Sequence, residues 1–227
     1  MRRLLIFTMV VICSALQPPS LAPAAESGLD SLDARLTEFI THPYRHGLPP
    51  YDIVMSFGPG ALPIVRQRLE EPGFAQFRPG MLIMIGYVGG PSETTLLEHY
   101  VMDRFEGELE ESDLRAVMAA LLALGCISDR DPAALAFLKS ATNPAHFNKV
   151  PFSSSIRGSE GLRLLLSKIA INGIGLSGRK EAEPILLELQ LHPYSRNQLG
   201  NVWDSLKGHR RLMEVGRSAL YGAPINK

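Results

Sequence analysis

Apolar residues recur along most of the chain at intervals of three and four positions. Between residues 111 and 128, Leu114, Val117, Met118 and Leu121 follow the i, i+3, i+4 spacing, which places apolar side chains on one face of a helix. The same spacing occurs in residues 158–172 and in four shorter segments, which read ALPIVRQRLEE, SETTLLEHYVMDRF, DPAALAFLKSA and KEAEPILLELQL. After residue 25, no segment alternates apolar and polar residues as strands do. The pattern therefore predicts an all-α protein.

Residues that begin and end helices lie between these segments. Asp131 precedes Pro132, which predicts a helix start. Aspartate caps the first N–H groups of a helix, and proline is tolerated at the first helical position because an N–H there would have no partner within the helix. Glycines and further prolines follow the predicted helix ends. These signals predict helix–turn–helix units throughout the chain.

Three glycine-containing turns separate the paired helices and repeat one another. The turns at residues 86–89, 125–128 and 175–178 are each followed, seven positions after the last residue, by Leu96, Leu135 and Ile185 respectively. A more divergent copy occupies residues 56–65. Successive turns begin 39 and 50 residues apart, and the irregular loop 142–160 contains the surplus. Periods of this length are typical of repeated two-helix units.

The segments that carry this pattern are MIGYVGGPSETTLLEHYV, LALGCISDRDPAALAFLKSA and INGIGLSGRKEAEPILLELQ, and they resemble HEAT repeats of the short bacterial kind. The resemblance covers about residues 50–192. It implies an α-solenoid of stacked helix–turn–helix units, whose exposed surfaces usually bind proteins, and it implies no catalysis. We therefore expect residues 26–227 to form one domain, in which LDSLDARLTEFI and a C-terminal helix over 194–216 cap the two ends of the stack.

Residues 173–178 have the spacing G-x-G-x-x-G, which also occurs in dinucleotide-binding turns. Such a turn needs a preceding strand and an acidic residue about 20 positions later. Here a helical pattern precedes the glycines, and LHPYS occupies the later position. We therefore predict a corner between two helices, in which glycine supplies a positive φ, and no nucleotide cofactor.

The first 25 residues predict a signal peptide. Two arginines precede an apolar run from Leu4 to Leu16, and Ala22 and Ala24 supply the small residues of a cleavage signal. We expect cleavage near Ala24–Ala25. The apolar run is too short for a permanent membrane span. These features predict a periplasmic or secreted bacterial protein with no stable membrane span once the signal is removed.

The charge and cysteine content of the remaining chain restrict its partners. Without the two leader arginines, 21 basic residues stand against 23 acidic ones, for a net charge of −2. This balance argues against nucleic-acid binding, which normally needs a basic patch. Cys126 has no second cysteine in the same mature chain, and its apolar surroundings predict a buried, small side chain.

No complete catalytic or metal-binding constellation is present in the sequence. Ser177 and Lys180 match S-x-x-K, but the K-T-G element that accompanies this motif in penicillin-binding enzymes is missing. His42 and His46 have i, i+4 spacing, but Pro43 disfavours a continuous helix through them, and two ligands are weak evidence for a metal. We therefore predict no catalytic residues, no metal and no cofactor, although an enzyme is not excluded.

The sequence favours a non-catalytic scaffold that mediates protein–protein interaction in a bacterial envelope. The protein partner is expected to bind along a groove formed by the second helices of the repeats, with loop 142–160 at its edge. The candidate contact residues are Arg66, Glu98, His99, Asp103, Arg104, His146, Lys149, Phe152 and Arg157.

The alternative is a small-ligand-binding protein or an enzyme with its site at loop 142–160. This loop interrupts the repeat period and combines aromatic and basic residues, with His146 as an acid–base candidate. Long ordered loops in compact domains are often functional, whereas flexible insertions are often merely tolerated. Both interpretations of the loop stay open at the level of sequence.

Overall fold

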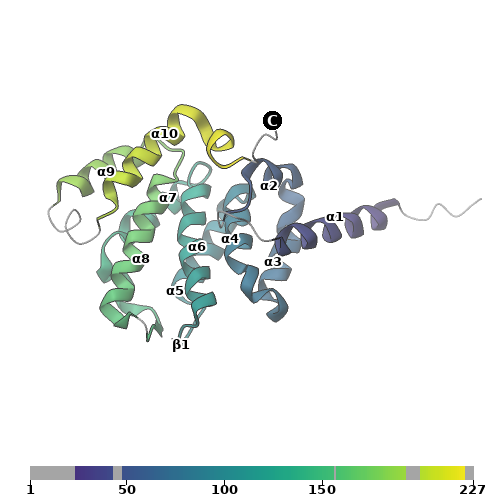
Figure 1. The fold of residues 1–227 in the computed structure, drawn as a ribbon, viewed down its shortest axis with the longest axis horizontal. Coiled ribbons are helices and arrows are strands. Elements are labelled where there is room, and N and C mark those ends of the chain that lie inside the picture. The colour runs from purple at the N-terminus through teal and green to yellow at the C-terminus, as the bar shows by residue number, and fades with distance from the viewer. Residues whose placement is uncertain (1–23, 43–47, 156, 193–199, 223–227) are drawn as a thin grey trace, which may run out of the picture.

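The computed structural model describes residues 24–42, 48–155, 157–192 and 200–222, and it confirms the predicted all-α class (Figure 1). The α-helices are α1 (Ala24–Thr41), α2 (Tyr51–Phe57), α3 (Leu62–Glu70), α4 (Arg78–Val88), α5 (Pro91–Met102), α6 (Glu111–Ile127), α7 (Pro132–Ala141), α8 (Gly158–Gly175), α9 (Ala182–Leu191) and α10 (Val202–Tyr221). Short 3₁₀ segments are η1 (Pro59–Ala61), η2 (Pro72–Phe77) and η3 (Pro144–Lys149), and the strands are β1 (Gly107–Glu108) and β2 (Phe152–Ser153). None of the helices described is long and apolar enough to cross a membrane.

Local capping explains where the helices on either side of α6 begin. The Asp131 carboxylate accepts a hydrogen bond from the N–H of Ala133 at 3.0 Å, which confirms the predicted start of α7 at Pro132. At the start of α5, the side chain of Glu93 turns back and accepts from the N–H of Gly90 at 2.8 Å. In both places a carboxylate satisfies an N–H group that has no partner within the helix.

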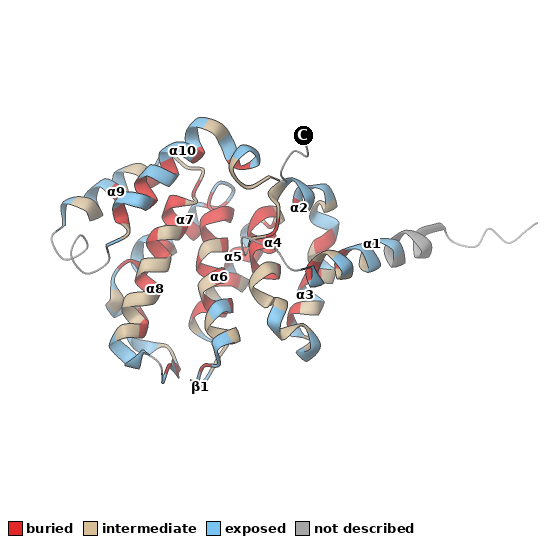
Figure 2. Ribbon diagram, viewed as in Figure 1, coloured by how far each residue is buried: buried red, intermediate tan, exposed pale blue. Residues whose placement is uncertain are grey.

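The helices pack in two alternating sets. Along one set, α2 packs against α4, α4 against α6, and α6 against α8. The intervening helices α3, α5, α7 and α9 each contact one or both of the helices that flank them in sequence. Figure 2 shows that the buried residues concentrate on α4, α6 and α8, and seven consecutive residues of α4, Met81 to Tyr87, are buried. The hydrophobic core therefore runs through this first set.

Glycines allow the helices of the first set to approach closely. A Cβ on Gly86 would lie 2.7 Å from the Cα of Ala123 in α6, and one on Gly125 would overlap the carbonyl of Gly173 in α8. A Cβ on Gly175 would lie 2.8 Å from the carbonyl oxygen of Ser205 in α10. Such backbone contacts leave no space for a side chain.

The predicted reason for these glycines was wrong. The described glycines with a positive φ are Gly58, Gly107, Gly158, Gly200 and Gly216. Gly58 belongs to the divergent copy at 56–65, but no glycine of the turns at 86–89, 125–128 and 175–178 is among them. The helices α4, α6 and α8 extend through the first glycine of each predicted turn. These three glycines are needed for close helix packing rather than for turning the chain.

The segment 142–160, which was expected to be an irregular loop, contains short regular elements. Helix α7 ends at Ala141 and α8 begins at Gly158, and between them lie η3 and β2. Strand β2 pairs in parallel with β1, with Gly107 opposite Phe152, and the N–H of Gly107 donates to the carbonyl of Pro151 at 2.9 Å. This two-residue ladder is too short to produce an alternating pattern in the sequence, and it ties the segment to the connection between α5 and α6.

The predicted terminal elements are only partly described. The signal peptide prediction falls mostly on residues 1–23, and His46 is in 43–47; both ranges lie outside the described residues. The expected C-terminal helix 194–216 corresponds to α10, which begins at Val202 and continues to Tyr221 across a kink at Gly216. Helix α10 packs against α8 and α9, as an end cap would, but it also packs against α2 (Figure 1).

Candidate functional site

Two ion pairs connect α3 with α5 and the residues that follow it. Arg66 on α3 pairs with Glu93 on α5, and the Glu93 side chain is almost completely buried. Arg104, two residues after α5 ends, pairs with Glu70 on α3 at 2.7 Å, and its guanidinium lies 5.9 Å from the ring centroid of Tyr100. The structure therefore brings two of the candidate residues, Arg66 and Arg104, to one interhelical surface.

A pocket of about 390 Å³ opens on this surface. Its lining residues come from α3 and α5, and they are Arg66, Leu69, Glu70, Ser92 and Leu96. Leu69 is buried and Leu96 is half-buried, so the floor is apolar. Arg66 and Glu70 supply charges of opposite sign at the wall. We call this region the α3–α5 pocket.

The other candidates on α5 lie away from this pair of salt bridges. The Nδ1 of His99 is 3.6 Å from a carboxylate oxygen of Asp103, and both side chains are largely exposed. Glu98 lies near Asp131, the residue that caps α7. Burial and the negative charge of Asp131 raise the pKa of Glu98. The five candidates around α5 therefore do not converge on one point.

The candidates in segment 142–160 differ in exposure. Lys149 and Arg157 are exposed, whereas Phe152 is only 7% exposed and packs within the hydrophobic core. His146 is half-buried between the rings of Phe137 and Phe147, with centroid distances of 5.1 and 5.2 Å. Burial lowers the pKa of His146, and its buried Nε2 has no hydrogen-bond partner. Phe152 therefore stabilises the segment, and only the two cations present their side chains fully to the surface.

A second, more polar pocket of about 300 Å³ lies between η3 and the first turns of α8. The residues that line it are Asn143, Pro144, Ala145, Asn148, Glu160, Arg163 and Leu164. Amide, carboxylate and guanidinium groups thus share one small concavity. His146, the acid–base candidate, is not part of this lining.

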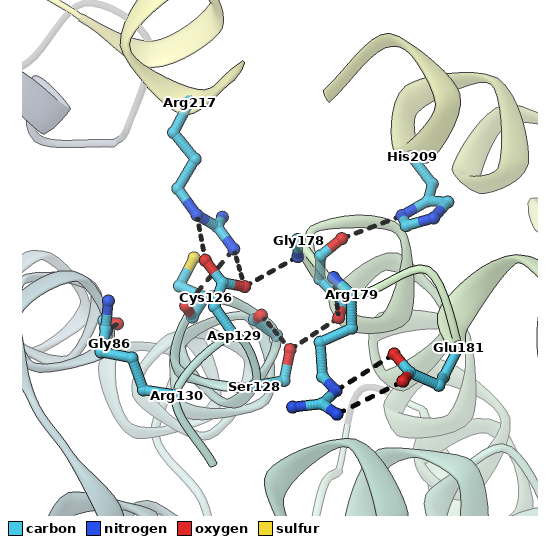
Figure 3. A network of polar contacts seen from close by, with 12 residues as sticks. Gly86, Cys126, Ser128, Asp129, Arg130, Gly178, Arg179, Glu181, His209 and Arg217 are labelled. Atoms are coloured by element: carbon cyan, nitrogen blue, oxygen red, sulfur yellow. Dashed lines mark hydrogen bonds and ion pairs between the residues drawn. The ribbon is translucent and has the colours of Figure 1, made fainter. Parts of the chain in front are cut away.

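The opposite end of the helices carries a polar network that the sequence did not reveal (Figure 3). The buried hydroxyl of Ser128 donates to the hydroxyl of Ser177 at 2.8 Å. Asp129 accepts from the N–H of Gly178 at 2.8 Å and from the guanidinium of Arg217 at 2.8 Å. Asp129 and Arg217 are 88 residues apart, so no local pattern could have paired them. The only signal was the similar order of residues in the two turns, Ser128-Asp129-Arg130 and Ser177-Gly178-Arg179.

The surroundings of this network also show how the S-x-x-K motif, the G-x-G-x-x-G motif and Cys126 are arranged. Ser177 is buried, and its hydroxyl accepts from the N–H of Arg179, whereas Lys180 is exposed, so the S-x-x-K pair is not arranged as nucleophile and base. The element before G-x-G-x-x-G is helix α8, not a strand. Cys126 is buried, as predicted, and burial raises the pKa of its thiol to about 11.

Among the described residues, no group of three or more histidine, cysteine, aspartate or glutamate side chains is arranged to hold a metal ion. Comparison of the chain with protein-family models, with curated proteins and with solved structures found no match. Function is therefore inferred from the residues and contacts of this chain alone.

Proposed function

We propose that this protein is an exported, HEAT-like α-solenoid scaffold that binds a protein partner in a bacterial envelope. The ordered packing of α2, α4, α6 and α8 supports a stack of two-helix units. The close contacts of Gly86 with α6 and of Gly125 with α8 support it too, because equivalent helix ends then meet in the same way in successive units.

The partner binds at the α3–α5 pocket. An apolar side chain of the partner fits against Leu69 and Leu96, while polar groups beside it meet Arg66 and Glu70. The Glu70 side chain is 57% exposed, so its ion pair with Arg104 is weak and can be exchanged for partner contacts at little cost. The Arg66 side chain is 45% exposed and can offer its remaining N–H groups to the partner while it stays paired with Glu93, whose side chain is only 4% exposed. The pocket itself, with an apolar floor and the charged groups of Arg66 and Glu70 at its wall, is the observation that carries this proposal.

Affinity capture from envelope extract tests the proposal with matched variants. Leu96→Arg places a long charged side chain in the pocket, and Arg66→Ala removes a wall. We expect each to reduce recovery of one specific protein by about tenfold or more, as for a central contact residue. Arg211→Ala, which breaks an exposed ion pair with Glu214 on α10, serves as the control and should retain the partner. Undiminished capture by Leu96→Arg would show that the partner does not use this pocket.

Segment 142–160 is tested with point variants rather than by deletion. Phe147 and Phe152 are buried, so removing residues 143–157 would expose the core and confuse folding with binding. Lys149→Ala and Arg157→Ala change exposed cations only. If the segment forms the edge of the binding surface, these variants weaken capture of the same partner, and unchanged capture removes the segment from the proposed surface.

A second candidate function is the binding of a small zwitterionic ligand at the pocket between η3 and α8. Glu160 and Arg163 both line this pocket and would meet an ammonium and a carboxylate respectively. A thermal-shift screen with amino acids and short peptides tests it, because a ligand that binds only the folded state raises the melting temperature. A shift that persists in Arg163→Gln would place the ligand elsewhere.

A further inference from the structure

The last turn of α10 lies across the ends of helices that are distant in sequence. At Gly216 the backbone leaves the helical conformation, with φ 79° and ψ 166°, and residues 217–221 form a separate short segment. We call Arg217–Tyr221 the strap. Within it only Arg217 is buried, whereas Ser218, Ala219, Leu220 and Tyr221 are exposed or half-exposed. Apolar burial therefore holds the strap only weakly.

Polar contacts of Arg217 supply most of the attachment. Its guanidinium donates to both carboxylate oxygens of Asp129, at 2.8 and 3.2 Å, and to the carbonyl of Cys126 at 3.3 Å (Figure 3). The Arg217 side chain is 7% exposed, while that of Asp129 is 32% exposed. A second, exposed contact joins Ser218 to Asp52 on α2 at 2.6 Å. Arg217 thus places a positive charge inside the protein, and the carboxylate of Asp129 is its counter-charge.

The same carboxylate also joins two other elements. Asp129 follows α6 directly, and it accepts from the N–H of Gly178 in the turn between α8 and α9. The strap, the end of α6 and this turn therefore meet at one side chain. Because an arginine stays protonated in proteins, the strap cannot avoid the cost of a buried charge by losing a proton.

The strap also lines a cavity beside its attachment. Tyr221 lines this cavity of about 280 Å³ together with Leu122 of α6, Leu176 at the end of α8 and Gly208 of α10. We call it the α6–α10 cavity; its other lining residues are Asn172, Gly175, Asp204 and Ser205, which make it partly polar. Leu122 also lines a second cavity, of about 420 Å³, which lies between α4 and α6 and includes Ile83 and Met118. Release of Tyr221 would widen the opening of the α6–α10 cavity next to Leu122.

We propose that the strap is a releasable latch, closed by the Asp129–Arg217 ion pair, and that its release uncovers the α6–α10 cavity. Loss of the carboxylate charge leaves the guanidinium buried without a counter-charge, which is far more costly than exposing a segment that buries little else. The strap then swings away at Gly216 while α6 and α8 stay folded. This device is independent of the partner-binding pocket between α3 and α5.

The test uses hydrogen exchange of the full mature chain with Asp129→Asn. The asparagine oxygen can still accept from Gly178, so the substitution isolates the charge. We expect exchange protection of residues 217–222 to fall by about tenfold or more, as expected for loss of a buried charge pair, with α6 and α8 still protected. Binding of the dye 8-anilinonaphthalene-1-sulfonate should increase, because Leu122 and Leu176 in the α6–α10 cavity become more accessible.

Two further variants make the result decisive. Asp129→Asn combined with Arg217→Met removes both charges, so the strap should close again and protection should return toward that of the natural chain. Glu183→Gln breaks the exposed pair between Glu183 on α9 and Arg210 on the first part of α10, and it should leave the strap unchanged. The proposal is overturned if Asp129→Asn leaves the strap protected, if protection is lost throughout α6 and α8, or if the double variant stays open.

Discussion

At the residue scale, His209 shows how a buried polar side chain couples α10 to the rest of the protein. Its Nδ1 lies 2.9 Å from the carbonyl oxygen of Ser177, so this nitrogen must carry the proton and donate it. The ring is 1% exposed, and Nε2 is buried without a hydrogen-bond partner. A second proton would therefore be placed in a site with no acceptor.

We predict that this histidine makes the protein less stable in mild acid. Burial lowers the pKa of His209 below its ordinary value of 6.5; Arg210 acts in the same direction, and the hydrogen bond to Ser177 and the charge of Glu183 oppose it. Below about pH 6.5 the unfolded chain binds a proton that the folded chain does not, so stability is lost as pH falls toward the folded pKa.

Urea midpoints measured between pH 7.5 and 5.5 check this prediction. His209→Asn can keep the hydrogen bond to Ser177 but has no titratable ring, so its midpoint should fall less over the same range. Some dependence should persist, because burial also lowers the pKa of His146. Identical pH profiles for the two proteins would mean that His209 is not responsible.

At the element scale, the sequence predicted most helices but misplaced their ends. The i, i+3, i+4 spacing identified α6 and α8, and Asp131 with Pro132 located the start of α7. Gly125 and Gly175 were interpreted as turn residues, although both belong to helices. A glycine is compatible both with a positive φ and with a neighbouring backbone at close range, and only the packed structure distinguishes the two.

The candidate site was less predictable than the helices. The structure places Arg66 and Arg104 at the ion pairs between α3 and α5, whereas Glu98, His99 and Asp103, predicted for the same surface, lie away from these pairs. The ion pairs of Arg66 and Arg104, and the burial of Phe152, depend on contacts between segments far apart in sequence. Spacing within one helix carries no information about such contacts.

Close packing of α6 on α8 gives a prediction about Gly125. In Gly125→Ala the new Cβ overlaps the backbone of Gly173, which cannot move like a flexible side chain, so the two helices must separate. We expect a loss of about 3 kcal/mol in the free energy of unfolding, at the upper end of overpacking effects. Gly208→Ala is the matched control: nothing lies within 4 Å of its Cβ position.

In Gly208→Ala, a helical glycine gains a better helix former without a clash, so stability should rise by about 0.5–1 kcal/mol. Urea denaturation followed by circular dichroism measures both variants. Equal effects of the two substitutions would show that helix propensity, rather than the approach of α6 to α8, decides the outcome at Gly125.

At the scale of the whole molecule, α10 connects parts that a simple stack of helices would leave independent. When each helix contacts only its neighbours, unfolding can begin at either end and spread. Here α10 packs on α8 and α9 near one end and on α2 near the other. The sequence predicted an end cap from the apolar face of this helix, but the return to α2 depends on the kink at Gly216 and on the Asp129–Arg217 pair.

We predict that this connection makes unfolding cooperative across the molecule. Trp203, the only tryptophan, lies in α10, so its fluorescence reports on that helix while circular dichroism reports on all helices. In the chain with α10 intact the two urea transitions should coincide. In a chain that ends at Gly216, α2 loses its link to α10, so the two transitions should separate. The circular dichroism transition should then indicate a loss of about 1–3 kcal/mol in the free energy of unfolding, because the Asp129–Arg217 ion pair that is removed is only partly shielded from water. A chain that ends at Gly222 keeps the strap and should behave like the chain with α10 intact. Coincident transitions in the shorter chain would mean that the core of α4, α6 and α8 alone couples the two ends.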